Sequence, residues 1–530
     1  MNPLTYVLIG LALALVALVL IILFRTLDFP VERAEVAPAA LPAVDGKSVA
    51  ERIGLAVQYK TIAYPEQEKI DGSQFKGLHQ LFETLYPQLH SQLKRELIND
   101  YSLLYTWQGS NPDLDPILFM AHQDVVPADE SPDSGWEHPP FSGEIADGYV
   151  WGRGTQDIKD VVICLLEAAS ELLKEGFQPT RTIYLAFGHD EEVSGNHGAR
   201  AISDMLKARG VQLSFVLDEG GSIMDNFVED VDAPVAMIGI SEKGYLSLKL
   251  QTDVPGGHSA MPPENTAIGL LALAVAALEA NQFPSRLEVL QFMMSYLGKE
   301  VPFMQRMALA NTWLFGNMLK KKLLKSPTTA ASMRTTTSPT IFHAGQAENV
   351  LPAKAEAIVN FRLMPGDTIK DVYERVRSVI GDDLVTLAPA KGETLESEYG
   401  WNPTPVSPTD SAQFERLDAI IRSVFPGVLT APFLVTGATD ARYYARICSN
   451  TFRFSPVLMT KADLAGVHGK NERLSFENAG RMVGFFIECM REISSMGTEA
   501  DMPPVEVIRQ VELPEFEPEP ELVVKPMKKG

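Results

Sequence analysis

The stretch TIYLAFGHDEEVSG, Thr182 to Gly195, is an apolar run that ends in three consecutive acidic residues. TIYLAF has the length and the β-branched and aromatic content of a buried strand. Asp190, Glu191 and Glu192 repel one another and add nothing to a core. So much negative charge at the end of a buried strand indicates a metal ion, with one glutamate as a ligand and its neighbour free to act as a base.

Two further apolar runs end in residues of the same kind. PILFMA, 116–121, leads into His122 and Asp124, and LSFVL, 213–217, leads into Asp218 and Glu219. Between the first two strands, DIKDVVICLLEAASELLKEGF has apolar residues at helical spacing. Strands that alternate with amphipathic helices predict an α/β fold with a mostly parallel sheet. Ligands bind such sheets at the carboxyl ends of the strands, so we expect these side chains to converge.

Asp157 in WGRGTQDIK and His468 in LAGVHGKNER complete the set of candidate ligands. Carboxylates and imidazoles without thiolates fit a hydrolytic zinc site or a related divalent site. Two ions about 3.5–4 Å apart need several ligands, one of them bridging, and this supply matches that demand. Each residue taken alone is better explained as a structural histidine, a solvated turn or a helix N-cap. Their placement at the ends of successive strands favours the metal site.

The length, the composition and the pattern of apolar residues indicate the domain organisation. A chain of 530 residues is long for one core, and a net charge of −22 argues against a nucleic-acid partner. Three widely spaced cysteines suggest neither disulfides nor a thiolate site.

From about residue 240, alternating strands surround a helix, which predicts an inserted α+β lid domain. The predicted order is an anchor (1–25), a linker (26–44), a zinc-binding catalytic domain (45–240 and 396–497), the lid (241–395) and a disordered tail (498–530).

The N-terminal run YVLIGLALALVALVLIILF, Tyr6 to Phe24, contains no charge and is long enough to cross a bilayer. The residues after it offer no small-residue cleavage site, so we expect an uncleaved single-pass membrane anchor. The Pro/Ala-rich segment that follows is expected to be a tether that lifts the body off the membrane. Arg25 and Arg33 follow the span and by the positive-inside rule favour a cytoplasmic body.

The motifs resemble, in order and spacing, the di-zinc metallopeptidase family that contains aminoacylase, succinyl-diaminopimelate desuccinylase and glutamate carboxypeptidases. The matching segments are AHQDVVP, WEHPPFSGEIADGYVWGRGTQDIK, GHDEEVSG, LDEGG, GGHSAMPP, ENVLP and NFRLMPGD. GHDEEVSG and the long insertion in the lid most resemble the carboxypeptidase S branch, which includes secreted enzymes that hydrolyse and form N-fatty-acyl amino acids. Relatives in secretory or vacuolar compartments imply an extracytoplasmic body, the placement that we adopt.

The resemblance implies a role for each matching position. Two Zn²⁺ ions, with Co²⁺ or Mn²⁺ as substitutes, would be held by His122, Asp157, Glu192, Asp218 and His468. Asp157 would bridge the ions, because it belongs both to the His122–Asp218 site and to the Glu192–His468 site. Asp124 would orient His122, and Glu191 would be the general base.

Outside the metal site, the resemblance implies that His258 of the lid stabilises the oxyanion. Arg362 with Asn349 would bind the free carboxylate of the substrate. Gly437 would lie in a substrate-binding loop, in which Ala438 replaces a second glycine of the family. The lid histidine of relatives often serves a partner subunit, which implies a homodimer through the lid.

These expectations describe a zinc hydrolase that cleaves the amide bond of N-acyl amino acids or short peptides with a free α-carboxylate. The reaction could run in both directions. A Gly-X type carboxypeptidase is the alternative enzyme, and a catalytically inactive binding protein is the alternative of another class. The extra helices between about residues 284 and 338 are explained either as a shield or acyl-chain site, or as the core of a larger lid.

Overall fold

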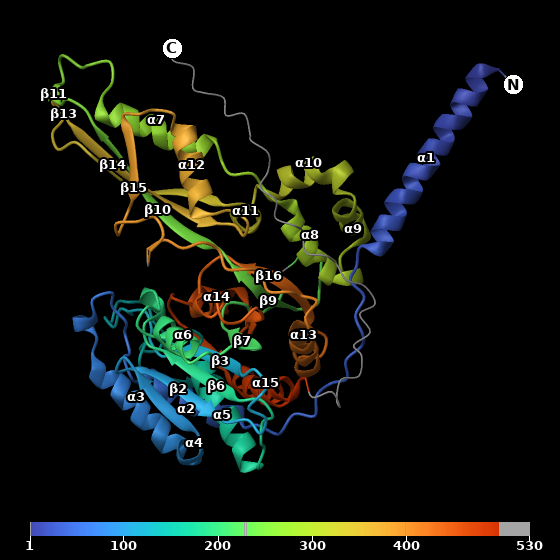
Figure 1. The fold of residues 1–530 in the computed structure, drawn as a ribbon, viewed down its shortest axis with the longest axis vertical. Helices are drawn as coiled ribbons and strands as arrows, with labels where there is room; N and C mark the ends of the chain where they lie inside the picture. The colour runs from blue at the N-terminus through green and yellow to red at the C-terminus, as the bar shows by residue number, and fades with distance from the viewer. Residues whose placement is uncertain (1, 227, 229, 398, 498–530) are drawn as a thin grey trace.

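The computed structural model describes residues 2–497 except 227, 229 and 398. Figure 1 shows a lower catalytic lobe, an upper lid lobe and a long N-terminal helix that projects away from both. The tail 498–530, predicted to be disordered, lies outside the described residues.

A ten-stranded sheet forms the centre of the catalytic lobe, with the order β1-β2-β6-β3-β7-β17-β9-β8-β18 and β16 beside β9. Its middle is parallel, from β6 through β3 and β7 to β17, and antiparallel pairs flank it. The parallel centre agrees with the prediction, whereas the antiparallel flanks were not foreseen. The strands are β1 (Lys94–Ile98), β2 (Ser102–Trp107), β3 (Ile117–His122), β6 (Ile183–Gly188), β7 (Phe215–Asp218), β8 (Ile223–Met224), β9 (Val235–Glu242), β16 (Leu429–Val435), β17 (Thr451–Arg453) and β18 (Leu458–Met459).

Helices cover both faces of this sheet because its central strands are apolar on both sides. Phe119 of β3 packs in one buried cluster with helices α2, α5 and α15, whereas its neighbour Leu118 packs in another with α6 and η4. The covering elements and connections are α2 (Gly46–Val57), η1 (Gln67–Lys69), α3 (Gly72–Leu85), α4 (Pro87–Gln92), β4 (Glu144–Ala146), β5 (Tyr149–Trp151), α5 (Lys159–Lys174), η2 (Glu191–Val193), α6 (Ala199–Ala208), α13 (Ala412–Val424), η4 (Asp440–Tyr443), α14 (Lys461–Gly466), β19 (Arg473–Ser475) and α15 (Phe476–Ser495).

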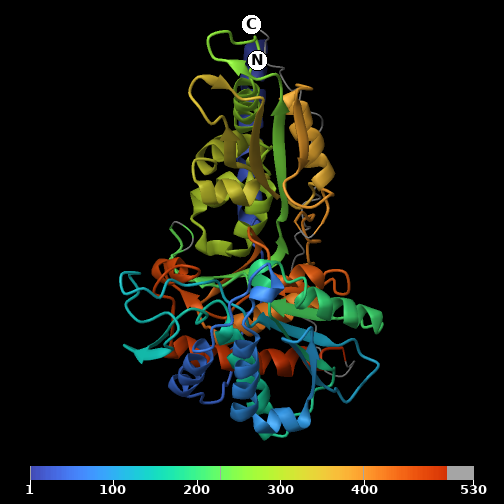
Figure 2. The same cartoon turned by 90° about the vertical axis from the view of Figure 1, so that its left-hand side faces the viewer.

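The lid has its own four-stranded antiparallel sheet, in the order β12-β14-β10-β15, and its own buried core. Alternation along β10 and β14 sends every second side chain into that core, where α7 and α12 cover the sheet. Figure 2 shows the lid as a tall, narrow layer standing on the catalytic lobe. Its elements are β10 (Gly244–Asp253), β11 (Gly257–His258), α7 (Ala267–Ala280), β12 (Thr336–Ala344), β13 (Val350–Leu351), β14 (Lys354–Leu363), α12 (Ile369–Ile380) and β15 (Val385–Pro389).

The extra helices do not enlarge the core of the lid. They are α8 (Leu287–Tyr296), η3 (Gly298–Glu300), α9 (Phe303–Ala310), α10 (Thr312–Leu323) and α11 (Pro327–Met333). Met294 and Leu309 instead share a buried cluster with Val235 of β9 and Ala431 of β16, which belong to the catalytic sheet. The larger-lid interpretation is therefore wrong for these side chains, because the insertion seals the open face of β9 and β16.

Helix α1 (Pro3–Asp28) is exposed along its length except at Thr26, and it is long and apolar enough for a membrane span or a signal sequence. The segment after it, residues 29–44, is a strap packed on the body, whereas we expected a tether that lifts the body off the membrane. Arg33 inserts its guanidinium between Asp418, at 2.6 Å, and the ring of Tyr296. Ala39 donates a backbone hydrogen bond to Ser423. Arg33 and Ala39 of this segment thus have partners on the body. The Pro/Ala-rich composition of the segment does not indicate such contacts.

We predict that Arg33→Met lowers the free energy of unfolding by about 1–3 kcal/mol, because it leaves the buried carboxylate of Asp418 with fewer partners. Lys47→Met is the matched control. It breaks an exposed pair with Glu51, and such pairs contribute between 0 and about 1 kcal/mol. Chemical denaturation monitored by circular dichroism measures both changes, and equal midpoints for the two variants would show that the strap adds no stability.

Candidate metal centre

The carboxyl ends of three neighbouring strands bring the candidate ligands together. His122 is the last residue of β3, Glu191 and Glu192 form the η2 turn after β6, and Glu219 directly follows β7. Because β6, β3 and β7 are parallel neighbours, these residues emerge at one edge of the sheet. This convergence is the arrangement that the strand pattern predicts.

Asp157 lies at the centre of the cluster and faces two histidines with its two oxygens. Its Oδ1 lies 3.1 Å from Nε2 of His122, and its Oδ2 lies 2.9 Å from Nε2 of His468. Asp157 is buried, in the turn before α5, while His468 comes from the loop after α14. One carboxylate is thus shared by two imidazoles from distant parts of the chain.

Each histidine also faces a second carboxylate. Oε1 of Glu219 lies 3.2 Å from Nε2 of His122, and Oε2 of Glu192 lies 3.1 Å from Nε2 of His468. The result is two groups of possible ligand atoms, His122–Asp157–Glu219 and Asp157–Glu192–His468. Within each group the atoms lie within 4.8 Å of one another.

The structure corrects one predicted ligand, because Asp218 does not face the cluster. Side chains alternate along β7, so Asp218 shares the face of Val216, which packs with Ala441. Its Oδ2 accepts a hydrogen bond of 2.8 Å from the backbone nitrogen of Ala441. Glu219, the next residue, occupies the position that we had given to Asp218.

The protonation balance of the cluster shows a need for positive charge. Burial raises the pKa of Glu191 well above its ordinary value, and it raises that of Glu219 to about 8. Hydrogen bonds to Asp157 and Glu192 raise the pKa of His468 to about 10. Burial opposes the charged form of His122, yet its hydrogen bonds with Asp124, Asp157 and Glu219 raise its pKa strongly. These shifts follow from the burial of several carboxylates around two imidazoles, an arrangement that bound cations would stabilise.

This donor set fits a pair of divalent ions. Imidazole nitrogens and carboxylate oxygens with no nearby thiolate are the ligands of hydrolytic zinc sites. Asp157, with one oxygen toward each histidine, is placed to bridge two ions. All three cysteines are free and buried. The cysteine spacing predicts neither a disulfide framework nor a thiolate metal site.

Asp124 orients the acidic turn as well as His122. The ring nitrogen Nδ1 of His122 lies 2.9 Å from the carbonyl oxygen of Asp124 and 3.5 Å from its carboxylate. The carboxylate itself accepts hydrogen bonds from the backbone nitrogens of Glu191 and Glu192. Asp190, the first acid of the turn, accepts backbone hydrogen bonds from His197 and Gly198 and lies outside the two ligand groups.

Glu472 is an important residue that the motif analysis missed. It is fully buried, and its Oε1 accepts hydrogen bonds from the backbone nitrogens of Gly154, Gln156 and Asp157. Its Oε2 pairs with Arg153 at 2.5 Å. Burial raises the pKa of Glu472 to about 7, and the pairing with Arg153 opposes that rise. The carboxylate of Glu472 thus fixes the turn that carries Asp157. In the sequence, the one signal for Glu472 is its position four residues after His468.

Two predicted residues lie far from the cluster in their own chain. His258 is exposed on β11, and Asn349 directly precedes β13, its partner strand. Asn349 accepts a backbone hydrogen bond from Ser259. Figure 1 places β11 and β13 at the free tip of the lid, away from β3, β6 and β7. These two residues therefore share one tip without reaching the metal ligands of the same chain.

Comparison with known proteins identifies the family. Residues 118–492 match the model of Peptidase family M20/M25/M40. The chain belongs to this family. It is 39% identical over 487 residues to the N-fatty-acyl-amino acid synthase/hydrolase PM20D1 of Xenopus tropicalis, covering 90% of this chain and 93% of that one. It is 32% identical to carboxypeptidase S of Saccharomyces cerevisiae, with 84% of each chain covered.

The fold is also that of solved members. An M20 family metallo-carboxypeptidase from Sulfolobus solfataricus aligns with a TM-score of 0.57 at 17% identity, over 83% of this chain and 98% of its own. Membership in the M20 family makes this protein a metallohydrolase that acts on amide or peptide bonds.

Arg362 lies away from Asn349 within the chain, and their joint binding of a substrate carboxylate stays a prediction. Arg362 pairs in register with Tyr245 at the base of the lid, whereas β14 begins at Lys354 near the tip. Eight residues of strand span about 26 Å, so the two side chains lie near opposite ends of β14. Within one chain the two residues therefore lie apart.

A stack of four side chains connects Arg362 to the catalytic lobe. The guanidinium of Arg362 lies 4.8 Å from the ring centre of Tyr245, which stacks on Trp401 at 5.0 Å. Arg442 lies 4.2 Å from the ring centre of Trp401, and it donates a hydrogen bond to the carbonyl of Ser194, just after the η2 turn. The stack gives Arg362 a fixed place relative to the acidic turn, and the sequence offers no signal for it.

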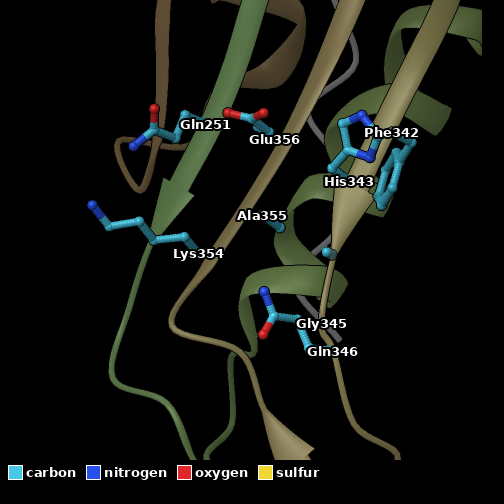
Figure 3. A pocket seen from close by; sticks show the side chains of 9 residues that line it. Gln251, Phe342, His343, Gly345, Gln346, Lys354, Ala355 and Glu356 are labelled. Carbon is cyan, nitrogen blue, oxygen red and sulfur yellow. The ribbon is translucent and has the colours of Figure 1, made fainter.

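Two other predicted features lie elsewhere. Gly437 is exposed in the loop between β16 and η4, where Thr439 is held by Glu242, and its contact with substrate stays a prediction. A hollow of about 660 Å³ on the lid is lined by His343, Phe342, Gln251 and Glu356 (Figure 3). His343 thus belongs to this lid surface and to neither ligand group.

We predict that Glu472→Gln weakens metal binding by roughly 10- to 100-fold, as expected for a residue that orients ligands. The amide cannot balance the buried Arg153 and loosens the turn that carries Asp157. Glu137→Gln is the matched control, because Glu137 is exposed and contacts Asn471 of the neighbouring loop. Competition with a fluorescent chelator measures both affinities. Wild-type affinity in Glu472→Gln, together with an unchanged melting temperature, would contradict this role.

Proposed function

We propose that this chain is a membrane-anchored di-zinc amidohydrolase of N-acylated amino acids or short peptides that carry a free α-carboxylate. The observation that carries the proposal is the Asp157 carboxylate, which faces one histidine with each oxygen. Membership in the M20 family supports the same reaction class.

In this proposal His122, Asp157 and Glu219 hold one ion, and Asp157, Glu192 and His468 hold the other. Bound zinc supplies a Lewis acid for the amide carbonyl and lowers the pKa of water. Asp190 is occupied by backbone hydrogen bonds from His197 and Gly198, and Glu192 has a ligand role, which leaves Glu191 as the acid of this turn that is free to act as a base. Burial raises the pKa of Glu191 above that of a free carboxyl group, the direction that suits a residue which accepts a proton and later returns it.

Glu191 acts as the base that removes a proton from the attacking water and then delivers it to the departing amine. The backbone hydrogen bond from Glu191 to Asp124 keeps the turn in place during both transfers. His258 donates a hydrogen bond to the oxyanion that forms on the carbonyl oxygen. The same residues serve the reverse reaction, in which an amine and a carboxylic acid condense.

The free carboxylate of the substrate binds Arg362, whose planar guanidinium matches a carboxylate in a bidentate manner. Its position over Tyr245 leaves its polar edge for a ligand while the ring supports its face. The name of the PM20D1 relative supports a fatty-acyl substrate, and that of carboxypeptidase S supports the Gly-X peptide alternative. Gly437 and Asn349 are assigned to the walls of the substrate site.

The lid offers a surface for a homodimer. β12 is the edge strand of the lid sheet, and it exposes Ile341 and Phe342, while α7 exposes Ile268 and Leu273. An exposed apolar edge strand invites pairing with a second copy. Such a dimer carries the lid tip of one subunit, with His258, toward the metal centre of the other. Helix α1 anchors each subunit, with the body on the extracytoplasmic side.

The proposal is tested by amine release from the full chain in lipid nanodiscs. The panel holds N-acetyl, N-myristoyl and N-oleoyl amino acids, Gly-X dipeptides and carboxyl-amidated controls, each with and without chelator. We expect chelator-sensitive cleavage that requires the free carboxylate and increases with acyl length. Preference for the dipeptides would select the carboxypeptidase alternative.

Glu191→Gln is the variant for this assay, since it removes the base and keeps the size of the side chain. We expect turnover to fall by about 10²–10⁴-fold with metal content unchanged. Turnover that persists in Glu191→Gln would assign the proton transfer to another group. Absence of turnover in the metal-loaded wild type across the panel would favour the binding-protein alternative.

Mixing two inactive variants tests the shared site. His258→Ala lacks the lid histidine and Glu191→Gln lacks the base, so a mixed dimer contains one complete site. We expect the co-expressed pair to recover activity that neither variant has alone. Light scattering that shows only monomer, or no recovery in a proven mixed dimer, would place His258 outside the reaction.

A further inference from the structure

Helix α9 lies against the body end of α1 (Figure 1), and α10 packs on α9 and follows it after Asn311. Arg25, which directly follows the uncharged span, donates a hydrogen bond of 3.1 Å to the carbonyl oxygen of Ala310. The buried amide of Asn311 donates to the carbonyl oxygen of Ile22 and approaches the hydroxyl of Thr26. A polar clamp thus joins α1 to the short turn between α9 and α10.

The clamp fixes the height of α10 relative to a bilayer. Arginine at the end of a span places its charged group at the interface, with its stem in the apolar layer. Since Arg25 bonds Ala310, and α10 begins at Thr312, the first turn of α10 lies at the same level. Any outward-facing side chain of that turn therefore meets the boundary between headgroups and acyl chains.

The outward face of α10 has the composition that this boundary favours. Trp313 is 55% exposed and Met318 is 60% exposed, and Leu314 between them is also exposed. Two further exposed apolar side chains, Phe303 and Met304, begin α9. Tryptophan and large apolar residues on one side of a helix are typical of an interfacial membrane contact, whereas exposed apolar clusters of this kind are rare on a free soluble surface.

Charge supports the same partner. The chain carries a net charge of −22, yet from Val301 to Ala347 it has no Asp or Glu. The same stretch contains six basic residues, which are Arg306, Lys320, Lys321, Lys322, Lys325 and Arg334. Lys321 is exposed and continues the face of Leu314 and Met318 along the helix, and Lys325 is exposed in the turn that follows α10. A basic patch that borders an apolar one matches an anionic phospholipid surface.

We propose that α9 and α10 form a second membrane contact, which rests on an anionic bilayer surface beside the α1 span. Phe303, Met304, Trp313, Leu314 and Met318 enter the interfacial layer, and Lys321 and Lys325 contact lipid phosphates. This proposal rests on the anchoring role of α1. Its occupant is the bilayer itself, and a second copy or a soluble protein at this face is an outcome that would overturn it.

The test uses the full chain in nanodiscs that contain phosphatidylserine and a lipid-borne quencher. The three native cysteines are buried, so a single introduced cysteine accepts a fluorescent label. Labels at Met318→Cys, at Met261→Cys on the lid (79% exposed) and at Leu15→Cys within α1 report three levels. We expect lipid quenching at positions 318 and 15, and quenching by aqueous iodide at position 261.

The outcomes separate the two claims. Lipid quenching at position 15 together with iodide quenching at position 318 would overturn the second contact and leave the anchor intact. No lipid quenching at position 15 would overturn the anchor, and the second contact with it. A label at position 318 that neither quencher reaches would show that protein covers this face, which also overturns the proposal.

The charged half of the face is tested with Lys321→Glu/Lys325→Glu. We expect this pair to lose most of the lipid quenching at position 318 in anionic discs. Lys207→Glu/Lys370→Glu, which makes the same charge change on other exposed surfaces, is expected to retain it. Equal quenching in both pairs would remove lipid phosphate from the proposal.

Discussion

The Asp157 carboxylate is the constraint on which the rest of the catalytic lobe depends. It must face His122 and His468 at once, although these residues are more than 300 positions apart in the chain. The buried carboxylate of Glu472 holds its turn from behind, while β3 fixes one histidine and the loop after α14 fixes the other. The parallel centre of the sheet is what brings these pieces to one edge.

The sequence predicted the parts of this centre that obey a repeating pattern. Apolar runs ending in His122, in the acidic turn and in LDEGG located three strand ends correctly, because buried parallel strands leave a strong hydrophobic signal. The prediction of Asp218 as the ligand was wrong by one residue, because Glu219 faces His122 and Asp157. Adjacent residues at a strand end point to opposite sides, and which one faces the site depends on the register of the sheet.

The remaining differences involve contacts between distant segments. Glu472 and Arg442 are unremarkable in the sequence, since the buried ion pair of Glu472 and the stack that contains Arg442 depend on partners that are distant along the chain. The strap and the helical insertion likewise look like a spacer and extra lid. Their true positions follow from Arg33 meeting Asp418 and from Met294 meeting the catalytic sheet, and no local pattern encodes either meeting.

The packed strap also has a consequence for the proposed anchored enzyme. A flexible tether would let the body adopt many orientations, whereas residues 29–44 are held on the body through Arg33 and Ala39. If α1 spans a membrane as proposed, a rotation of α1 about its own axis would turn the metal centre with it. An amphiphilic substrate in the same leaflet would then reach the site by lateral diffusion.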